Sequence, residues 1–68
     1  MNWSRGDQIE VIIDREGLGH GEGIGHLPDE TMVVIAGAGD KVGQSVRAMV
    51  MNIEETALGP SVRANAIP

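Results

Sequence analysis

The chain has almost no aromatic residues and no cysteine, and this limits the kind of core that it can build. Phenylalanine, tyrosine and cysteine are absent from its 68 residues, and Trp3 is the single aromatic side chain. Disulfides and thiolate metal sites are therefore excluded, although domains of this size often depend on such supports. The core must be aliphatic. A closed barrel of short strands is compatible with a small aliphatic core, and its closure removes exposed sheet edges. The length of the chain allows one domain at most.

Hydrophobic alternation predicts a first strand over residues 7–14. Ile9, Val11 and Ile13 fall on one side of an extended chain, and the other side is polar except for Ile12. Ile12 is therefore a candidate for a contact surface.

The glycine-rich stretch 16–25 carries five of the chain's ten glycines at alternating positions. Glycine weakens regular strands and admits unusual backbone conformations. This predicts a mobile loop that leads into a tightly curved second strand at residues 24–27. A turn at residues 28–31 follows, since Pro28 fixes φ and Asp29 can bond back to its own backbone.

The next apolar run, residues 31–36, predicts a central strand buried on both faces. A glycine-rich turn follows it. Near the end of the chain, residues 56–61 predict a turn and residues 62–67 a last short strand.

Residues 44–55 are compatible with either a helix or a strand. Helical spacing would align Val42, Val46, Met49, Val50 and Ile53. A strand would instead place Val46, Ala48 and Val50 inward, with Arg47, Met49 and Met51 outward. Periodicity alone slightly favours the helix, but the neighbouring strands favour a strand, which is the interpretation that we adopt.

The charge balance restricts how the chain can bind nucleic acid. Five Lys and Arg residues against ten Asp and Glu residues give a net charge of −5 and a pI near 4.7. Phosphate neutralisation supplies most non-specific affinity, so any RNA binding must be local or weak. The chain also lacks a signal-peptide pattern and the run of roughly 20 apolar residues that a membrane span needs, so we expect no membrane association and a cytoplasmic location.

Motifs for catalysis or for cofactor binding are not found. The glycine frames that start at Gly19, Gly21 or Gly23 fail the dinucleotide-binding spacing. His20, Glu22 and His26 are too few for a closed metal site. No serine has an evident histidine and acid arrangement. We therefore expect no enzyme activity, no metal, no cofactor and no small-molecule substrate.

The outward strip of the strand at residues 44–55, formed by Arg47, Met49 and Met51, has two interpretations. It is either covered by another element or parent domain, or it is an adaptable contact surface, because methionine packs against varied partners and arginine stacks on bases or pairs with phosphates. The strip motivates an alternative function, a protein-interaction or oligomerisation module that has lost much of its RNA affinity.

Three stretches carry a resemblance to a known family. They are GEGIGHLPDETMVVIAGA (residues 21–38), KVGQSVRAMV (residues 41–50) and EETALGP (residues 54–60). From Arg5 to about Ala64 the chain resembles the TRAM domain that follows a PIN nuclease domain in bacterial PIN/TRAM proteins. The resemblance implies an all-β, five-stranded OB-like or SH3-like barrel over residues 5–66, after an N-terminal extension at residues 1–4. It also implies a strand at residues 44–55.

The function that this resemblance implies is non-catalytic binding of tRNA or other structured or single-stranded RNA, in some proteins to deliver a nuclease domain to that RNA. By position, it implies that the RNA-binding residues are Arg15, His20, His26, Lys41, Arg47 and Arg63, with Glu22 in the same loop. The chain departs from the family pattern at His26 and Arg63, which replace aromatic residues, at Pro60, which replaces an arginine, and at Glu30, which replaces a glycine. A base stacked on an aromatic ring contributes about 1–3 kcal/mol, so the loss of these rings should lower the affinity for RNA. We therefore expect weak and salt-sensitive binding, and guanidinium stacking by Arg63 would restore part of the lost affinity.

Overall fold

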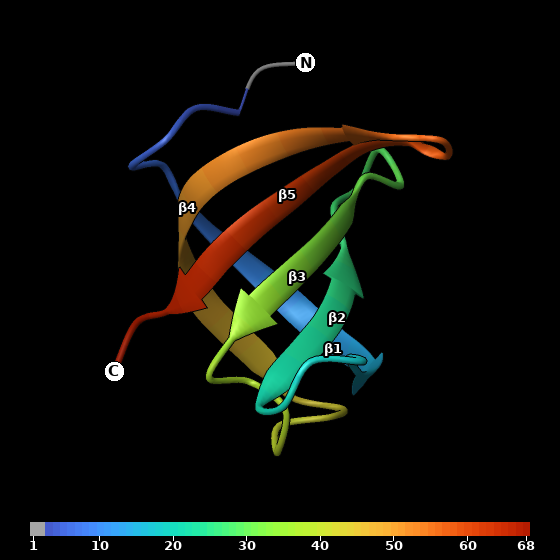
Figure 1. Ribbon diagram of the computed structural model, residues 1–68. Coiled ribbons are helices and arrows are strands. Elements are labelled where there is room, and N and C mark those ends of the chain that lie inside the picture. Colours follow the sequence, from blue (N-terminus) through green and yellow to red (C-terminus); the bar gives the residue numbers. More distant parts are fainter. Residues whose placement is uncertain (1–2) are drawn as a thin grey trace.

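The computed structural model describes residues 3–68, which form five β-strands. These are β1 (Gln8–Glu16), β2 (Glu22–His26), β3 (Met32–Ala36), β4 (Ser45–Thr56) and β5 (Gly59–Ala66). The strands close into a barrel in the order β1-β2-β3-β5-β4, and pairing of β4 with β1 completes the ring (Figure 1). The β3–β5 pair is parallel and the other four pairs are antiparallel. The predicted small all-β barrel is confirmed.

The core of the barrel is aliphatic, as the composition requires. The alternating residues of β1 that were predicted to face inward are buried, and so are those of β4. The largest fully buried side chains are Ile13, Ile35, Val33, Val50 and Val62. Trp3 packs against the edge of this cluster rather than inside it. Since full burial of a valine or isoleucine contributes about 1.5–3 kcal/mol, the cluster supplies the stability that disulfides provide in many small domains.

The glycines of β2 have a structural reason, which is the close approach of neighbouring strands. A Cβ atom at Gly25 would overlap the Val11 side chain and lie 2.5 Å from the backbone oxygen of Ile12. One at Gly23 would lie 2.6 Å from the backbone oxygen of Ala38. Both positions face inward, where the barrel has no room for a side chain. The strand starts at Glu22, two residues earlier than the sequence predicted.

The segment that was compatible with a helix is a strand, and a register shift explains why its pattern was mixed. Val50 pairs with Ala64 and Asn52 pairs with Arg63, so an irregularity lies between them, at Met51. Such a bulge moves the inward set by one residue. Ile53 therefore packs against the core instead of Asn52, and the apolar spacing becomes uneven, as in a helix.

Two other expectations differ in detail from the structure. In β3 the inward Val33 and Ile35 are fully buried but Met32 and Val34 are half-buried, so the strand is not buried on both faces. The last strand begins at Gly59 rather than at residue 62, because the turn before it is only Ala57 and Leu58. The expected extension 1–4 lies partly outside the described residues. Within residues 3–68, no helix is long and apolar enough to cross a membrane.

Candidate functional site

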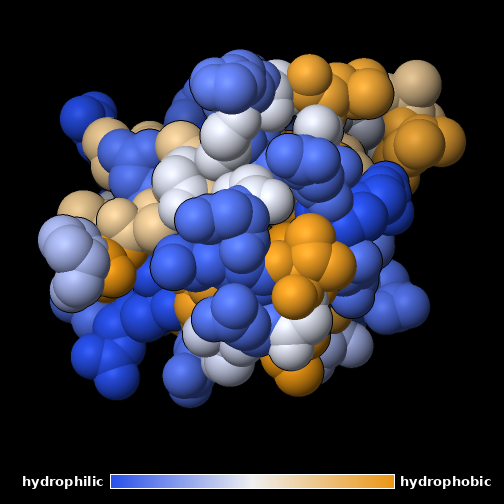
Figure 2. All heavy atoms as spheres, turned by 90° about the horizontal axis from the view of Figure 1, so that it is seen from below, coloured by the Kyte–Doolittle hydropathy of each residue, from blue (hydrophilic) through white to orange (hydrophobic). Residues whose placement is uncertain are grey.

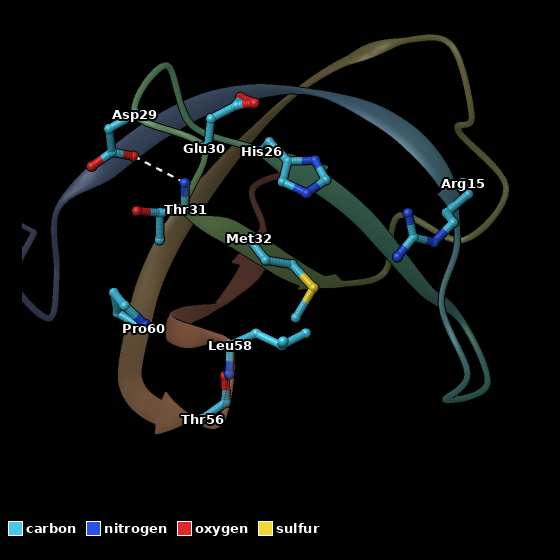
Figure 3. A pocket seen from close by; sticks show the side chains of 9 residues that line it. All are labelled: Arg15, His26, Asp29, Glu30, Thr31, Met32, Thr56, Leu58 and Pro60. Carbon is cyan, nitrogen blue, oxygen red and sulfur yellow. Dashed lines mark hydrogen bonds between the residues drawn. The ribbon is translucent and has the colours of Figure 1, made fainter.

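A groove of about 430 Å³ lies on the outer surface of the barrel, where strand ends meet the β2–β3 loop and the β4–β5 turn (Figure 3). We call it the β2–β3 groove. Met32 and Leu58 lie at its centre, with Arg15 at one side and Asp29 and Thr31 at the other. The full lining is Arg15, His26, Asp29, Glu30, Thr31, Met32, Thr56, Leu58 and Pro60. Three of the nine lining residues are apolar and six are polar or charged, so the lining is more polar than that of a typical small-molecule pocket.

One row of paired residues, which runs across four neighbouring strands, connects the groove to the rest of this face. Arg15 on β1 pairs with Ile24 on β2, Ile24 with Val34 on β3, and Val34 with Arg63 on β5. Arg15 and Arg63 are exposed, whereas the two aliphatic residues between them are buried or half-buried. The barrel thus brings two predicted RNA-binding arginines, distant in sequence, to either side of one apolar strip.

Arg63 is held by carboxylates from two other strands. Its Nε donates to Oε1 of Glu54 at 3.1 Å, and its Nη1 donates to Oε2 of Glu22 at 3.3 Å. The hydrogen bonds from Glu22 and Glu54 raise the pKa of the Arg63 guanidinium. Because all three side chains are partly exposed, each pair contributes at most about 1 kcal/mol to stability. One cation between two anions leaves this spot with a local charge that repels phosphate.

His26 is likewise oriented by a carboxylate. Its Nδ1 lies 2.7 Å from Oδ2 of Asp14, and the two side chains are 37% and 48% exposed. The register of β1 against β2 shifts between Ile13 and Arg15, at Asp14. A bulge re-aims the side chains beside it, so Asp14 can reach His26 while Arg15 reaches the groove. The contact orients the imidazole ring through Nδ1 and does not involve Nε2.

The β2–β3 loop forms the predicted turn, and one of its residues is strained. The Thr31 amide donates to Oδ1 of Asp29 at 3.0 Å. Hydrogen bonds from Thr31 hold the pKa of the Asp29 carboxyl below its usual 3.8. Glu30 next to it has a φ of 73°, the left-handed region. For a residue with a Cβ this conformation costs about 1–2 kcal/mol, so the turn suits glycine better than glutamate.

The remaining predicted residues lie elsewhere on the barrel. His20 and Lys41 belong to the β1–β2 and β3–β4 loops, which meet because the amides of Gly37 and Gly39 donate to the Gly21 oxygen at 2.9 and 3.1 Å. Figure 2 views the end of the barrel that carries these loops, and its surface is mostly hydrophilic with separate hydrophobic patches. The six predicted RNA-binding residues are therefore not one cluster.

Of the predicted RNA-binding residues, Arg47 lies farthest from the groove around the ring of strands. It is exposed on β4 and pairs with Glu10 of β1. In the strand order, this β1–β4 pair lies across the ring from β3. Met49 is exposed on the same face, whereas Met51 is half-buried at the register shift of β4.

Several groups at the site were not found by sequence reasoning. Met32 and Leu58 are apolar residues of the groove lining, and Leu58 is 98% exposed at the tip of the β4–β5 turn. A large apolar residue inside a predicted turn was the available signal for Leu58. The carboxylates that hold Arg63 and His26 had no such signal, because their contacts join separate strands. Among residues 3–68, no three His, Cys, Asp or Glu side chains come together to hold a metal ion.

Comparison with known families decides the relationship that the sequence motifs suggested. The model of the TRAM domain matches residues 2–58. The chain belongs to the TRAM domain family. TRAM domains are generally RNA-binding modules and are not catalytic; in PIN/TRAM proteins the PIN domain is a separate unit. This TRAM domain has the all-β fold that the resemblance implied.

Two relatives are similar to this chain, and the name of one of them records a PIN domain together with a TRAM domain. The "PIN and TRAM-domain containing protein YacL" of Bacillus subtilis, described as uncharacterized, is 27% identical over 59 residues, which are 87% of this chain and 16% of that protein. An uncharacterized protein in the scsB 5' region of Thermus thermophilus is 33% identical over 54 residues, or 79% of this chain and 58% of that protein. The chain thus spans only part of either relative. No solved structure matches it.

Proposed function

We propose that this TRAM domain binds RNA on the outer face of β2 and β3, between the β1–β2 loop and the β4–β5 turn. Five-stranded OB-type barrels bind oligonucleotides on this face and with these loops. The observation that carries the proposal is the position of Arg15, which lies on the edge of the β2–β3 groove and pairs across the sheet with the apolar strip of Ile24 and Val34. The ligand is tRNA or another structured or single-stranded RNA, and the domain itself performs no chemistry.

Each part of this face has a separate task in the proposal. Arg15 pairs with a phosphate at the edge of the groove. Met32 and Leu58 provide apolar contact for a base, and His26, held by Asp14, provides a ring on which a base can stack. His20 and Lys41, in the loops at one end of the barrel, extend the path along which the RNA strand would lie. Arg47 lies off this path.

The carboxylates on this face set the expected affinity. Glu22 and Glu54 already occupy Arg63, and Asp29 and Glu30 line the groove. Phosphates that approach this face meet carboxylates as well as cations. We therefore expect dissociation constants of about 10⁻⁵ to 10⁻⁴ M at physiological salt, the weak half of the range for non-specific nucleic-acid binding.

The relatives suggest how weak binding would be useful. In a longer protein such as YacL, whose name records a PIN and a TRAM domain, we propose that the TRAM domain brings a nuclease domain to RNA. A second RNA contact by the partner domain would raise the overall affinity through effective concentration. The catalytic groups would then belong to the partner domain.

Fluorescence anisotropy with tRNA and with single-stranded RNA tests the proposed function. At low salt both RNAs should bind, and the logarithm of the affinity should fall with the logarithm of salt concentration. Absence of binding at the lowest salt, with the domain folded by circular dichroism, would rule the function out.

The β1–β4 side favours a second candidate, a protein-interaction or homo-oligomer surface. The exposed apolar side chains Ile12 and Met49 lie there, 61% and 38% exposed, next to Arg47. We propose that the Arg47, Met49 and Met51 strip contacts a protein partner or a second copy. Sedimentation should then show an oligomer that Met49→Lys dissociates, and a strict monomer would exclude the homo-oligomer.

A further inference from the structure

Glu30 combines a strained backbone with a carboxylate that the fold does not use. Its φ is 73°, and its side chain lines the β2–β3 groove. In the part of the chain that the structure describes, its carboxylate makes no hydrogen bond or ion pair. The neighbouring Asp29 differs, because its carboxylate caps Thr31 and so holds the turn. Glycine would suit the turn at position 30, so the glutamate side chain has no task within the fold.

The groove next to Glu30 has the size of a small-ligand site. Its volume of about 430 Å³ lies in the lower part of the range for such pockets, about 300–1,000 Å³. Met32 and Leu58 offer apolar surface for a flat ring, and the His26 ring is fixed by Asp14. Arg15, on the opposite side from the loop, supplies a cation for the attached phosphate. These groups together offer apolar, aromatic and cationic contacts of the kind that one nucleotide can use.

The chemistry of a carboxylate selects among the four bases. An ionised carboxylate only accepts hydrogen bonds, and two parallel bonds to it are strong. Guanine presents two adjacent donors, N1–H and the 2-amino group, on its Watson–Crick edge. Adenine and cytosine present one amino donor beside a ring acceptor, and uracil one donor between two acceptors. That edge is free only in an unpaired base, so a duplex does not qualify.

We propose that the β2–β3 groove binds one unpaired guanine of an RNA strand, and that Glu30 recognises it by accepting from N1–H and the 2-amino group. This rests on the proposed function, RNA binding on the same face, and adds to it a base and a specificity-determining residue. Glu30 lies at the rim of the groove and its side chain is exposed, so rotation about its side-chain bonds would bring the carboxylate to a base held there.

Anisotropy titrations with short oligouridines test the proposal. The probes carry one central guanosine, inosine or adenosine, or uridine throughout. The guanosine probe should bind about tenfold more tightly than the adenosine probe, which controls for purine stacking. The inosine probe, which lacks the 2-amino group, should fall between them.

Variants at Glu30 separate recognition from folding. Glu30→Gly removes the carboxylate and relieves the backbone strain, so loss of recognition in it cannot come from loss of the fold. Glu30→Gly and Glu30→Gln should both reduce the guanosine preference to less than about twofold while all-uridine binding persists. Glu10→Gln, which removes the same charge on the β1–β4 side, should keep the preference.

Three results would overturn the inference. One is equal affinity of the wild-type domain for the guanosine and adenosine probes while all-uridine RNA binds; RNA binding would then stand without this recognition. Another is a guanosine preference that survives in Glu30→Gly. The third is absence of binding to every probe at low salt, which would remove the proposed function as well.

Discussion

The two outer faces of this barrel share one core but differ in how regular their strands are. On the β1–β4 side, the pairing runs without interruption from Gln8 with Met49 to Ile12 with Ser45. On the β2–β3 side, β1 is bulged at Asp14, β2 has glycine at its inward positions, and the β2–β3 loop contains the strained Glu30. On the described surface, the groove is lined by the β2–β3 side and by the adjoining ends of β1, β4 and β5, and by no residue of the regular ladder at Gln8–Ile12. The groove on the described surface therefore lies next to the bulge at Asp14 and the strained turn at Glu30, and not over the regular β1–β4 ladder.

Removing the close approach of β2 to β1 should have the largest effect. Gly25→Ala would place a Cβ atom against Val11 and 2.5 Å from the Ile12 oxygen. We expect it to destabilise the domain by about 2–3 kcal/mol and so to disrupt both faces, as measured by urea denaturation. Gly43→Ala is the control: no heavy atom lies within 4 Å of its Cβ and its φ is 86°, so only backbone strain of about 1–2 kcal/mol is added. Wild-type stability in Gly25→Ala would contradict this packing.

Two charge-matched variants should separate the faces by RNA affinity. Arg15→Ala removes a cation from the groove, and Arg47→Ala removes one from the β1–β4 side. We expect the first to weaken RNA binding about tenfold and to lower the salt slope by about one, and the second to change affinity less than about twofold. Anisotropy titrations over a range of salt measure both. Equal losses in the two variants would mean that RNA does not distinguish the faces.

Glu30→Gly should stabilise the domain, because the groove side carries backbone strain at this residue. Glycine adopts a φ of 73° without penalty, so the free energy of unfolding should rise by about 1 kcal/mol. Glu55→Gly makes the same change on exposed β4, outside the groove lining, and should destabilise by about 0.5–1 kcal/mol. Urea midpoints for both variants provide the measurement. A Glu30→Gly variant that is less stable than wild type would show that the side chain supports the turn.

The strand pattern was predictable wherever the ladder is regular. Ile9, Val11 and Ile13 alternate cleanly because β1 is straight over these residues, and their burial followed directly from the sequence. The segment at residues 44–55 was ambiguous for a physical reason. A register shift at Met51 breaks the period of two, and no local signal in the sequence marks where a bulge falls.

The site was less predictable than the fold because it depends on pairing across strands. Arg15 and His26 were expected on an RNA-binding surface, and the barrel does bring them to one groove. The partners of Arg63 on β2 and β4 could not be foreseen, because strand order and register together decide which carboxylates reach it. The sequence did mark position 30 as unusual for the family, but only the φ value explains the physical consequence.

The smallest expected effect concerns the capped turn beside the groove. The pKa of Asp29 lies below its usual 3.8 in the folded domain. Its hydrogen bonds with Thr31 therefore contribute to stability above the unfolded-state pKa, and this contribution is lost as pH falls through the lowered pKa. The urea midpoints of wild type and Asp29→Ala should differ at about pH 6 and converge on acidification below the carboxyl pKa. A difference that persists unchanged in acid would assign the effect to something other than the ionised carboxylate.

Mapping RNA-induced chemical-shift changes onto the barrel tests most directly whether the irregular face is the binding face. Amide resonances of the ¹⁵N-labelled domain would be followed during titration with a guanosine-containing oligouridine at low salt. We predict the largest shifts at Arg15, His26, Glu30, Met32 and Leu58, with little change along Gln8–Ile12 and its partners on β4. Shifts concentrated on the β1–β4 ladder, with the groove residues unaffected, would contradict the assignment of the RNA-binding face.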